Sequence, residues 1–423
     1  MKNRFTYFLS LAFLFIVAVA NAQQPALQYF RPNDKNGLNV FETGKEDSVE
    51  FDKLKVRLGG AFAIQYQAID HENDAGNLVN LINNFNLPTA NFDIDVQLAD
   101  GVRMHLRTYL SSRHHTETYV KGGYIQIDRL DFIKKDFLGG LMDKVTIKIG
   151  QMENNYGDAH FRRTDNGHAL YNPFVGNYIM DSFTTEIGGE IYYQTNGWLA
   201  MVGITNGRLN QSVADTSTMA ALIAKVGYDK QLSEDLRIRL TGSIYNVNNT
   251  SNTYLYGGDR AGSRYYKVMD LEGGSTNDFS GRINPRYKTD MTSIMINPFV
   301  KFKGLEFFGV FETTSGYDKV ADASFDGDRT WTQLAGELIY RFGREEKLYG
   351  GVRFNTVTGQ LPGEETDKVT VNRFNIGGGW FMTKNILAKI EYMTQSYEDY
   401  PVGQVQFRGG KFSGLMIEAV IAF

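Results

Sequence analysis

The sequence predicts an all-β fold: a transmembrane antiparallel β-barrel of about sixteen strands, with short periplasmic turns and long extracellular loops. Three observations predict it. Many segments alternate apolar and polar side chains over the ~9–11 residues that a membrane strand needs. The links between these segments are alternately short and long. Aromatic residues sit on the apolar faces near the segment ends, as in the girdles of membrane barrels.

The N-terminus predicts export. Two basic residues, Lys2 and Arg4, precede a long apolar run that ends in the small-x-small pattern Ala20-Asn21-Ala22. This order is typical of a cleaved signal peptide, and the run is shorter than a spanning helix requires. The predicted division of the chain is a signal peptide at 1–22, a periplasmic N-terminal segment at 23–50 and the barrel at 51–423.

Composition excludes several classes of protein. The chain has no cysteine, which rules out disulfides, thiol chemistry and a lipid anchor on cysteine. Its formal net charge is −4, and loss of the two basic residues of the signal peptide makes it −6, which is too acidic for a general nucleic-acid binder. The six histidines have no catalytic spacing, and there is no Gly-x-Ser-x-Gly motif. We therefore expect that the protein is not an enzyme and that it has no cofactor and no metal site.

The strands follow from two-residue periodicity. In the first, Leu54, Val56 and Leu58 share one face, and Lys55 and Arg57 share the other. The same pattern recurs as far as the final residue. The predicted strands are 53–68, 91–98, 102–111, 117–128, 143–151, 185–195, 198–205, 219–229, 235–245, 291–302, 305–313, 329–342, 347–357, 369–382, 386–395 and 411–423.

The second and third strands predict a register. Only an odd number of linking residues keeps both apolar faces on one side, because a one-residue slip reverses every side chain. Ala99-Asp100-Gly101 is such a link, with Gly101 suited to the left-handed position. This register sets Asp93 opposite Arg107 and Asp95 opposite His105, with all four inside the barrel.

The lengths of the links predict the topology. If residue 53 starts at the periplasm, the periplasmic links are short and the outer links long, with one exception in each set. The predicted periplasmic links are 99–101, 129–142, 196–197, 230–234, 303–304, 343–346 and 383–385. The predicted outer loops are 69–90, 112–116, 152–184, 206–218, 246–290, 314–328, 358–368 and 396–410.

The outer faces carry two further membrane signals. Aromatic residues lie near strand ends, although they could also fill a soluble core: Tyr66, Trp198, Tyr228, Phe302, Tyr340, Phe342, Trp380 and Tyr392. The last strand places Leu415, Ile417, Ala419 and Ile421 on one face with the terminal Phe423. This ending resembles the signal that presents barrels to the barrel-assembly machinery. We therefore expect that machinery and the outer-membrane lipids as partners.

The third outer loop, residues 152–184, is the predicted constriction. A barrel of this size encloses water, so its function depends on what narrows the lumen. The loop is long and mixes aromatic with charged residues, and we expect it to fold inward; a solvated surface loop is the alternative. No third ligand accompanies Asp158 and His160, so we interpret that pair as ordinary loop residues. The candidate constriction residues are Asp158, His160, Arg162, Arg163 and Asp165.

The polar strand faces predict the pore lining. The candidate lining residues are Lys53, Lys55, Arg57, Asp93, Asp95, Arg103, His105, Arg107, Arg237 and Arg239. Rings of Arg and Lys favour anions, but cross-strand Asp–Arg pairs neutralise part of that field. The sequence therefore predicts passive diffusion of small anions or neutral hydrophilic solutes, with at most a weak, phosphate-like anion preference. The alternative is a barrel with a mainly binding or structural role through its outer loops.

Several short motifs support a family resemblance. They are Gln28-Tyr29-Phe30-Arg31-Pro32-Asn33-Asp34 with Gly37-Leu38, Gly150-Gln151, Asn155-Tyr156-Gly157-Asp158, His160-Phe161-Arg162-Arg163 and Glu186-Ile187-Gly188-Gly189-Glu190. With these motifs the chain resembles Bacteroidota outer-membrane porins related to the phosphate-selective porin O and P family. The resemblance implies a Gram-negative outer-membrane location, anion or phosphate passage, and often a homotrimer.

Overall fold

The structure is a computed structural model that describes residues 24–111, 119–165, 168–209, 219–258, 265–274, 281–324 and 327–423. The predicted signal peptide at 1–22 lies outside the described residues. The sixteen strands are β1 (Lys55–Glu72), β2 (Asn84–Ala99), β3 (Val102–Ser111), β4 (Tyr119–Ile127), β5 (Val145–Glu153), β6 (Thr185–Thr195), β7 (Trp198–Thr205), β8 (Ala221–Gln231), β9 (Leu236–Val247), β10 (Asp290–Phe302), β11 (Leu305–Tyr317), β12 (Arg329–Phe342), β13 (Leu348–Gln360), β14 (Lys368–Phe381), β15 (Ile386–Glu398) and β16 (Lys411–Ala422).

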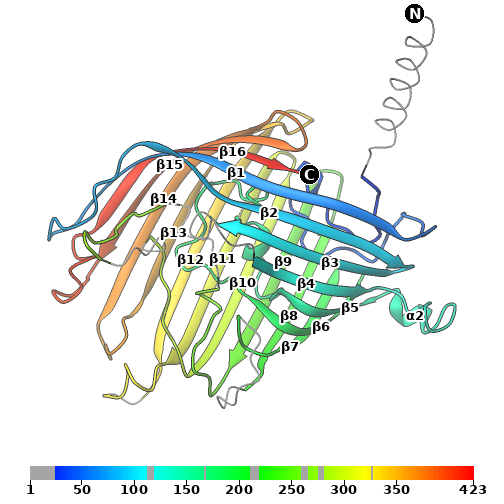
Figure 1. Cartoon of the computed structure of the whole chain (residues 1–423), viewed down its shortest axis with the longest axis horizontal. Coiled ribbons are helices and arrows are strands. Elements are labelled where there is room, and N and C mark those ends of the chain that lie inside the picture. Colours follow the sequence, from blue (N-terminus) through cyan, green and yellow to red (C-terminus); the bar gives the residue numbers. More distant parts are fainter. Residues whose placement is uncertain are drawn as a thin grey trace, which may run out of the picture.

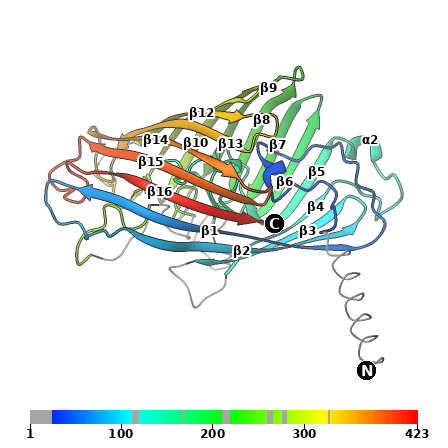
Figure 2. The same cartoon turned by 90° about the horizontal axis from the view of Figure 1, so that it is seen from above.

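The strands form one closed antiparallel barrel in which each strand pairs with its neighbours in sequence. The first and last strands close it, with Ala61 opposite Ala422 and Glu72 opposite Lys411. In both views the red β16 lies beside the blue β1 (Figures 1 and 2). The predicted fold class is confirmed, and each predicted strand matches an observed one. The largest difference is β2, which begins seven residues earlier and carries a bulge against β1.

The predicted hairpin register is confirmed. Asp93 pairs with Arg107 and Asp95 with His105 across β2 and β3. Gly101 has φ +65°, and a Cβ there would lie 2.5 Å from the Cβ of Arg129, so the turn requires glycine. The Asn196-Gly197 turn has positive φ at both residues, as a two-residue hairpin link does.

The outward faces are apolar and exposed. On β12, Leu334, Leu338 and Tyr340 alternate with buried Gln333, Glu337 and Ile339. Ile417 on β16 and the terminal Phe423 directly after it are exposed, as predicted for the C-terminal strand. Several predicted girdle residues are also exposed, and Trp198 and Tyr228 pack with ring centroids 5.0 Å apart. A belt of this kind suits contact with hydrocarbon rather than water.

The links divide the barrel into a short-turn end and a long-loop end. The exception at the short-turn end is the link between β4 and β5, which contains the short helix α2 (Gly139–Met142). Among the described residues, no helix is long and apolar enough to cross a membrane. The long loops pack on one another: Val79 N donates to Asp270 O at 2.9 Å, and Gln406 Nε2 donates to Met269 O at 2.6 Å.

The interior differs from the uniformly wet lumen that the sequence predicted. The inner faces of β6–β16, here called the packed side, carry apolar residues such as Met295, Phe299 and Met393, which are fully buried under long loops. Among the described residues, β2–β5 contribute no member to the two apolar clusters. Their inner faces, here called the polar side, carry charged and amide side chains. The expectation of water along every wall is therefore wrong for the packed side.

The N-terminal segment lies across the short-turn end of the barrel. Lys35 N donates to Lys384 O at 2.8 Å, and Asn33 Nδ2 donates to Phe423 O at 3.0 Å. On the other side, Gln28 Nε2 donates to Asp100 Oδ1 at 2.9 Å. Phe41 is buried against the ring of Phe299 inside the barrel. The segment therefore covers much of this opening.

A charge on the outward face should destabilise the barrel according to its depth. Leu334 lies near the middle of β12 and Phe342 at its end, and both are exposed. We expect Leu334→Arg to lower the free energy of unfolding in lipid by about 2–4 kcal/mol, and Phe342→Arg by about 0–1 kcal/mol. Urea titration of the liposome-refolded barrel measures both values. Equal costs at the two positions would contradict a hydrocarbon belt centred on this face.

Candidate functional site: the third loop inside the lumen

The third loop enters the barrel and crosses it. It leaves β5 and returns to β6, yet its tip contacts β13 and β15. In a ring of sixteen strands β13 is eight strands from β5 in either direction, which places it on the opposite wall. The alternative from the sequence, a solvated surface loop, does not describe the residues of this segment that the structure describes.

The loop tip is held on the far wall by hydrogen bonds to its backbone. Lys389 Nζ on β15 donates to the carbonyls of Ala169 and Phe174 at 3.0 and 2.9 Å. Val175 N donates to Glu391 Oε2 at 2.8 Å, and Tyr349 OH donates to the carbonyl of Pro173 at 3.0 Å. Wall side chains thus replace the water that a surface loop would bind.

Apolar burial adds to this anchoring. Val175, Ile179 and Met180 are fully buried against the packed side. Burial of such a side chain stabilises by about 1.5–3 kcal/mol, so these three alone contribute several kcal/mol toward the inward position. This explains why β6–β16 carry apolar residues on both faces: the outer set meets lipid and the inner set meets the loops.

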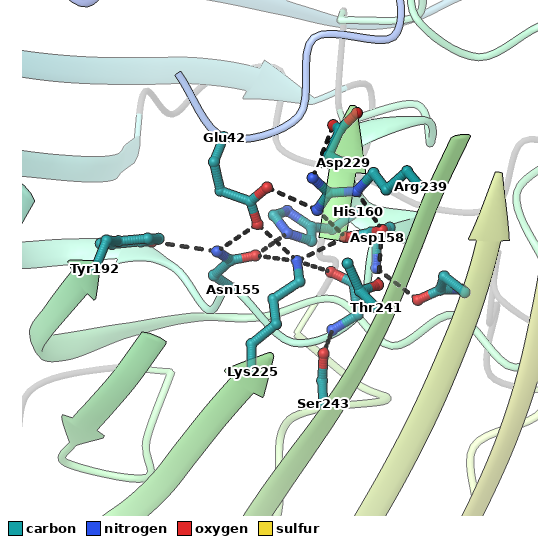
Figure 3. A network of polar contacts seen from close by, with 12 residues as sticks. Glu42, Asn155, Asp158, His160, Tyr192, Lys225, Asp229, Arg239, Thr241 and Ser243 are labelled. Atoms are coloured by element: carbon teal, nitrogen blue, oxygen red, sulfur yellow. Dashed lines mark hydrogen bonds and ion pairs between the residues drawn. The ribbon is translucent and has the colours of Figure 1, made fainter. Parts of the chain in front are cut away.

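A charged network holds the root of the loop (Figure 3). Asp158 accepts two hydrogen bonds from Arg239, both at 2.8 Å, and one from Thr241 Oγ1 at 2.8 Å. Lys225 Nζ lies 2.7 Å from Asp158 Oδ1 and 2.9 Å from Glu42 Oε1. Arg239 Nη2 also donates to Glu42 Oε2 at 2.6 Å. The network therefore joins the loop, the N-terminal segment and two wall strands.

The two carboxylates of this network remain ionised. Burial by itself would raise the pKa of Glu42, but the adjacent Arg239 and Lys225 outweigh it and hold that pKa well below its usual range. The pKa of Asp158 is likewise lowered, because the same two cations outweigh its burial. The charges of Lys225 and Arg239 therefore balance those of Glu42 and Asp158, and none of these four side chains is more than 4% exposed.

Arg162 and Arg163 lie inside the lumen, but both are paired. Arg162 Nη2 donates to Glu337 Oε2 at 3.1 Å on the packed side. Arg163 makes a two-pronged contact with Asp181 of the same loop, at 2.8 and 2.6 Å. Neither guanidinium is exposed to the solvent. They fix the loop in place rather than presenting a bare positive charge.

The loop also touches the polar side. Asp165 accepts a hydrogen bond from Arg107 Nη1 at 3.2 Å and pairs with Lys121 on β4. His168 Nδ1 lies 3.3 Å from Arg107 Nη2. Burial and the Arg107 charge lower the pKa of His168 to about 3, so its ring is neutral and can accept that hydrogen bond. The loop therefore reaches both walls of the barrel.

His160 is a structural loop histidine in this arrangement. Its Nε2 lies 2.9 Å from Asn155 Oδ1. Asp158, two residues away, is bound to Arg239 and Lys225 instead of to the imidazole. The other ring nitrogen of His160, Nδ1, lies 3.5 Å from Glu153 Oε2.

A cavity of about 210 Å³ remains between the loop, the N-terminal segment and the polar side. Arg103 and His105 both contact Asp95, and Arg107 is bidentate on Asp93. The lining includes seven Arg or Lys side chains and five Asp or Glu side chains: Arg31, Arg57, Arg103, Arg107, Lys121, Lys148, Arg163, Glu42, Asp93, Asp95, Glu153 and Asp165. The cavity is thus highly charged but nearly balanced.

Of the residues predicted to line the pore, Arg57, Asp93, Asp95, Arg103, His105 and Arg107 line this cavity. Arg237 and Arg239 point from β9 into the barrel, and both are paired with Asp229, at 2.7 and 3.1 Å. Lys53 precedes β1 and is exposed, and Lys55 pairs with Asp52 at 2.7 Å at the rim. The structure does not bring these two lysines into the cavity, because Lys53 precedes β1 and Lys55 is its first residue, at the edge of the barrel.

Sequence reasoning missed Glu42 and Lys225. Lys225 was within reach, because it shares the inward parity of Ala221 and Ile223 on β8. Glu42 lies in a segment without periodicity, so no local pattern places it inside the barrel.

The fold can be compared with known proteins at this point. No known protein family and no curated protein matches the sequence. Solved structures do match. OmpT of Vibrio cholerae in its trimer form aligns with a TM-score of 0.52 at 9% identity, covering 88% of this chain and 100% of that one. The anion-selective porin of Comamonas acidovorans gives 0.52 at 12% identity, with 88% and 100% covered.

A third match is the outer membrane channel DcaP of Acinetobacter baumannii, with a TM-score of 0.50 at 11% identity, covering 88% of this chain and 97% of that one. The chain has the porin fold. Because these identities are low, the matches establish the architecture and leave solute and selectivity to the residues of this chain.

Proposed function

We propose that the chain is an outer-membrane channel through which small hydrophilic solutes diffuse, with the third loop as its constriction. The observation that carries this proposal is the course of that loop, which crosses from β5 to β13 and contacts both walls of a closed barrel. A barrel of sixteen strands is wide enough for water, and such a loop sets how much of it stays open. The apolar outer belt supports placement in a membrane.

We further propose that solutes pass along the polar side, since the packed side is filled by loops. The lining of the cavity there holds seven cations and five anions, an excess of two positive charges. Pairs such as Arg107–Asp93 cancel much of the local field. A weak anion preference follows from this small excess. A homotrimer and delivery by the barrel-assembly machinery stay predictions from the resemblance and from the terminal strand.

Lys148→Glu tests this assignment of the route. Lys148 lines the cavity, and the change removes the excess of two positive charges. We expect the reversal potential under a KCl gradient to indicate weak anion preference in the unchanged protein and none, or cation preference, in the variant. Single-channel recordings in planar bilayers measure this. The matched control is Lys347→Glu at the exposed turn between β12 and β13, which should leave selectivity unchanged.

Two outcomes would overturn the proposal. Clear cation selectivity of the unchanged protein would contradict the charge count of the cavity. An absence of any conductance from correctly folded barrel would favour the second candidate, a binding role for the outer loops. That candidate has its own support, because the loops after β1, β9 and β15 bind one another across the long-loop end.

A further inference from the structure

A second cavity opens among the long loops. It has a volume of about 290 Å³ and lies between the loops that follow β9, β13 and β15. Ligand sites start near this size, so it suits a molecule of one ring rather than a polymer. The residues that define it are Arg282, Arg286, Trp331, Leu361, Tyr400 and Phe407.

The lining of this cavity carries charges of one sign, unlike the nearly balanced lining of the cavity beside the polar side. Thirteen described residues line it, and they include two arginines but no aspartate or glutamate. Arg282 reaches Asp181 of the third loop at 3.4 Å, while Arg286 is exposed. Amide groups of Asn284 and Gln404 add further hydrogen-bonding capacity. The lining is therefore rich in donors and positively charged, which calls for a ligand with negatively charged acceptors.

Two buried polar groups in the lining have no hydrogen-bond partner among the described residues. They are Trp331 Nε1 and the hydroxyl of Tyr400. Trp331 is 1% exposed and Tyr400 is 7% exposed. An indole N–H can only donate, and a buried donor without an acceptor is unfavourable, so an acceptor atom supplied by a ligand would satisfy it.

The cavity also has an apolar wall. Tyr400 and Phe407 pack with ring centroids 5.4 Å apart, and Phe407 stacks on Tyr397 at 5.0 Å. Leu361 and Pro362 lie in the same lining. The indole of Trp331 packs directly against Gly359, where a Cβ would lie 2.2 Å from indole Cδ2. A flat apolar body fits beside these groups.

We propose that this cavity binds a small organic carboxylate with a ring-sized apolar body before it enters the barrel. The guanidinium groups of Arg282 and Arg286 receive the carboxylate, and the aromatic wall receives the ring. The cavity adjoins the third loop, because Ile283 N donates to Ile179 O at 2.8 Å and Arg282 reaches Asp181. The proposal rests on the proposed channel for its role in transport, but binding itself needs no open pore.

Tryptophan fluorescence can test binding directly. The chain has three tryptophans, and Trp198 and Trp380 face outward on the barrel, 63% and 50% exposed. In Trp198→Phe/Trp380→Phe, Trp331 is the one remaining tryptophan. We expect benzoate to change its emission with saturation, and benzyl alcohol or glucose at equal concentration to have no such effect. The same titration of the unchanged protein serves as a second measurement should the double variant fold poorly.

The matched arginine variants decide the role of charge. Arg286→Gln should weaken benzoate binding by about tenfold or more, since it removes a charge-assisted contact. Arg408→Gln is the control, because Arg408 lies at the same end of the barrel but pairs with Asp74 at 3.4 Å outside the cavity. A linear, unsaturating response, equal binding of glucose, or identical affinities in the two variants would overturn the proposal. Saturable binding by a barrel that does not conduct would uphold this site while the channel proposal fails.

Discussion

Replacing residues 154–184 by a short Gly-Ser turn is expected to raise single-channel conductance on the order of twofold or more, because the loop fills the width of a barrel that is otherwise wide enough for water. The replacement is sterically simple, since Glu153 and Thr185 are paired neighbours in the sheet. Wall charges such as Lys389 would lose their loop partners and gain hydration in the open lumen. Recordings in planar bilayers measure the change.

Retained strand content by circular dichroism would show that the shortened barrel still folds. The deletion also removes the buried Val175, Ile179 and Met180 from the packed side, so some loss of stability is expected as well. Unchanged conductance in a folded barrel would show that another segment limits the flow. The N-terminal segment at the short-turn end would then be the next to remove.

Asp158→Asn is expected to be among the most destabilising single changes in the lumen. It keeps the shape of the side chain but removes a charge that binds both Arg239 and Lys225 in a fully buried position. Removing one partner of a buried ion pair costs about 3–5 kcal/mol. Urea unfolding in lipid measures the loss, and single-channel traces should become noisier as the root of the loop loosens.

The control for this variant is Glu72→Gln. Glu72 pairs with Lys411 at 2.8 Å, but both side chains are mostly exposed, so the change should cost at most about 1 kcal/mol. Adding Lys225→Met to Asp158→Asn should recover part of the stability, because the double change removes one cation and one anion, so that Glu42 balances Arg239 and Asp229 balances Arg237. Equal losses for Asp158→Asn and Glu72→Gln would mean that the network does not hold the loop.

Much of the barrel could be predicted because strand geometry is local. Successive side chains of a strand point to opposite faces, so the outward direction of Leu334 and the inward direction of Glu337 can be predicted from β12 alone. Turn parity then linked neighbouring strands, as Gly101 and the Asp93–Arg107 pair show. The inward course of the third loop was predicted from its length, its composition and its ordinal position. Its contacts were not, because irregular backbone has no period.

The residues of the site illustrate this limit. Arg162 and Arg163 were expected to stand at the constriction, and they do lie in the lumen, but Glu337 and Asp181 neutralise them. Met295 and Phe299 point inward from β10 and are covered by protein rather than by water. The alternation of a strand shows which side chains point inward, but it does not show whether water or a loop covers them.

By itself the sequence determined the all-β class, the strand order, the register of the hairpin between the second and third strands, and the faces of the residues in the regularly alternating strands. These depend on a repeat of two residues and on the conformational needs of short turns. Only the tertiary structure decided which inward faces are wet, that Glu42 and Lys225 complete the network at Asp158, and that Trp331, Arg286 and Tyr400 share a cavity. Those contacts join segments far apart in the chain, and they form only when the closed barrel brings opposite walls and loops together.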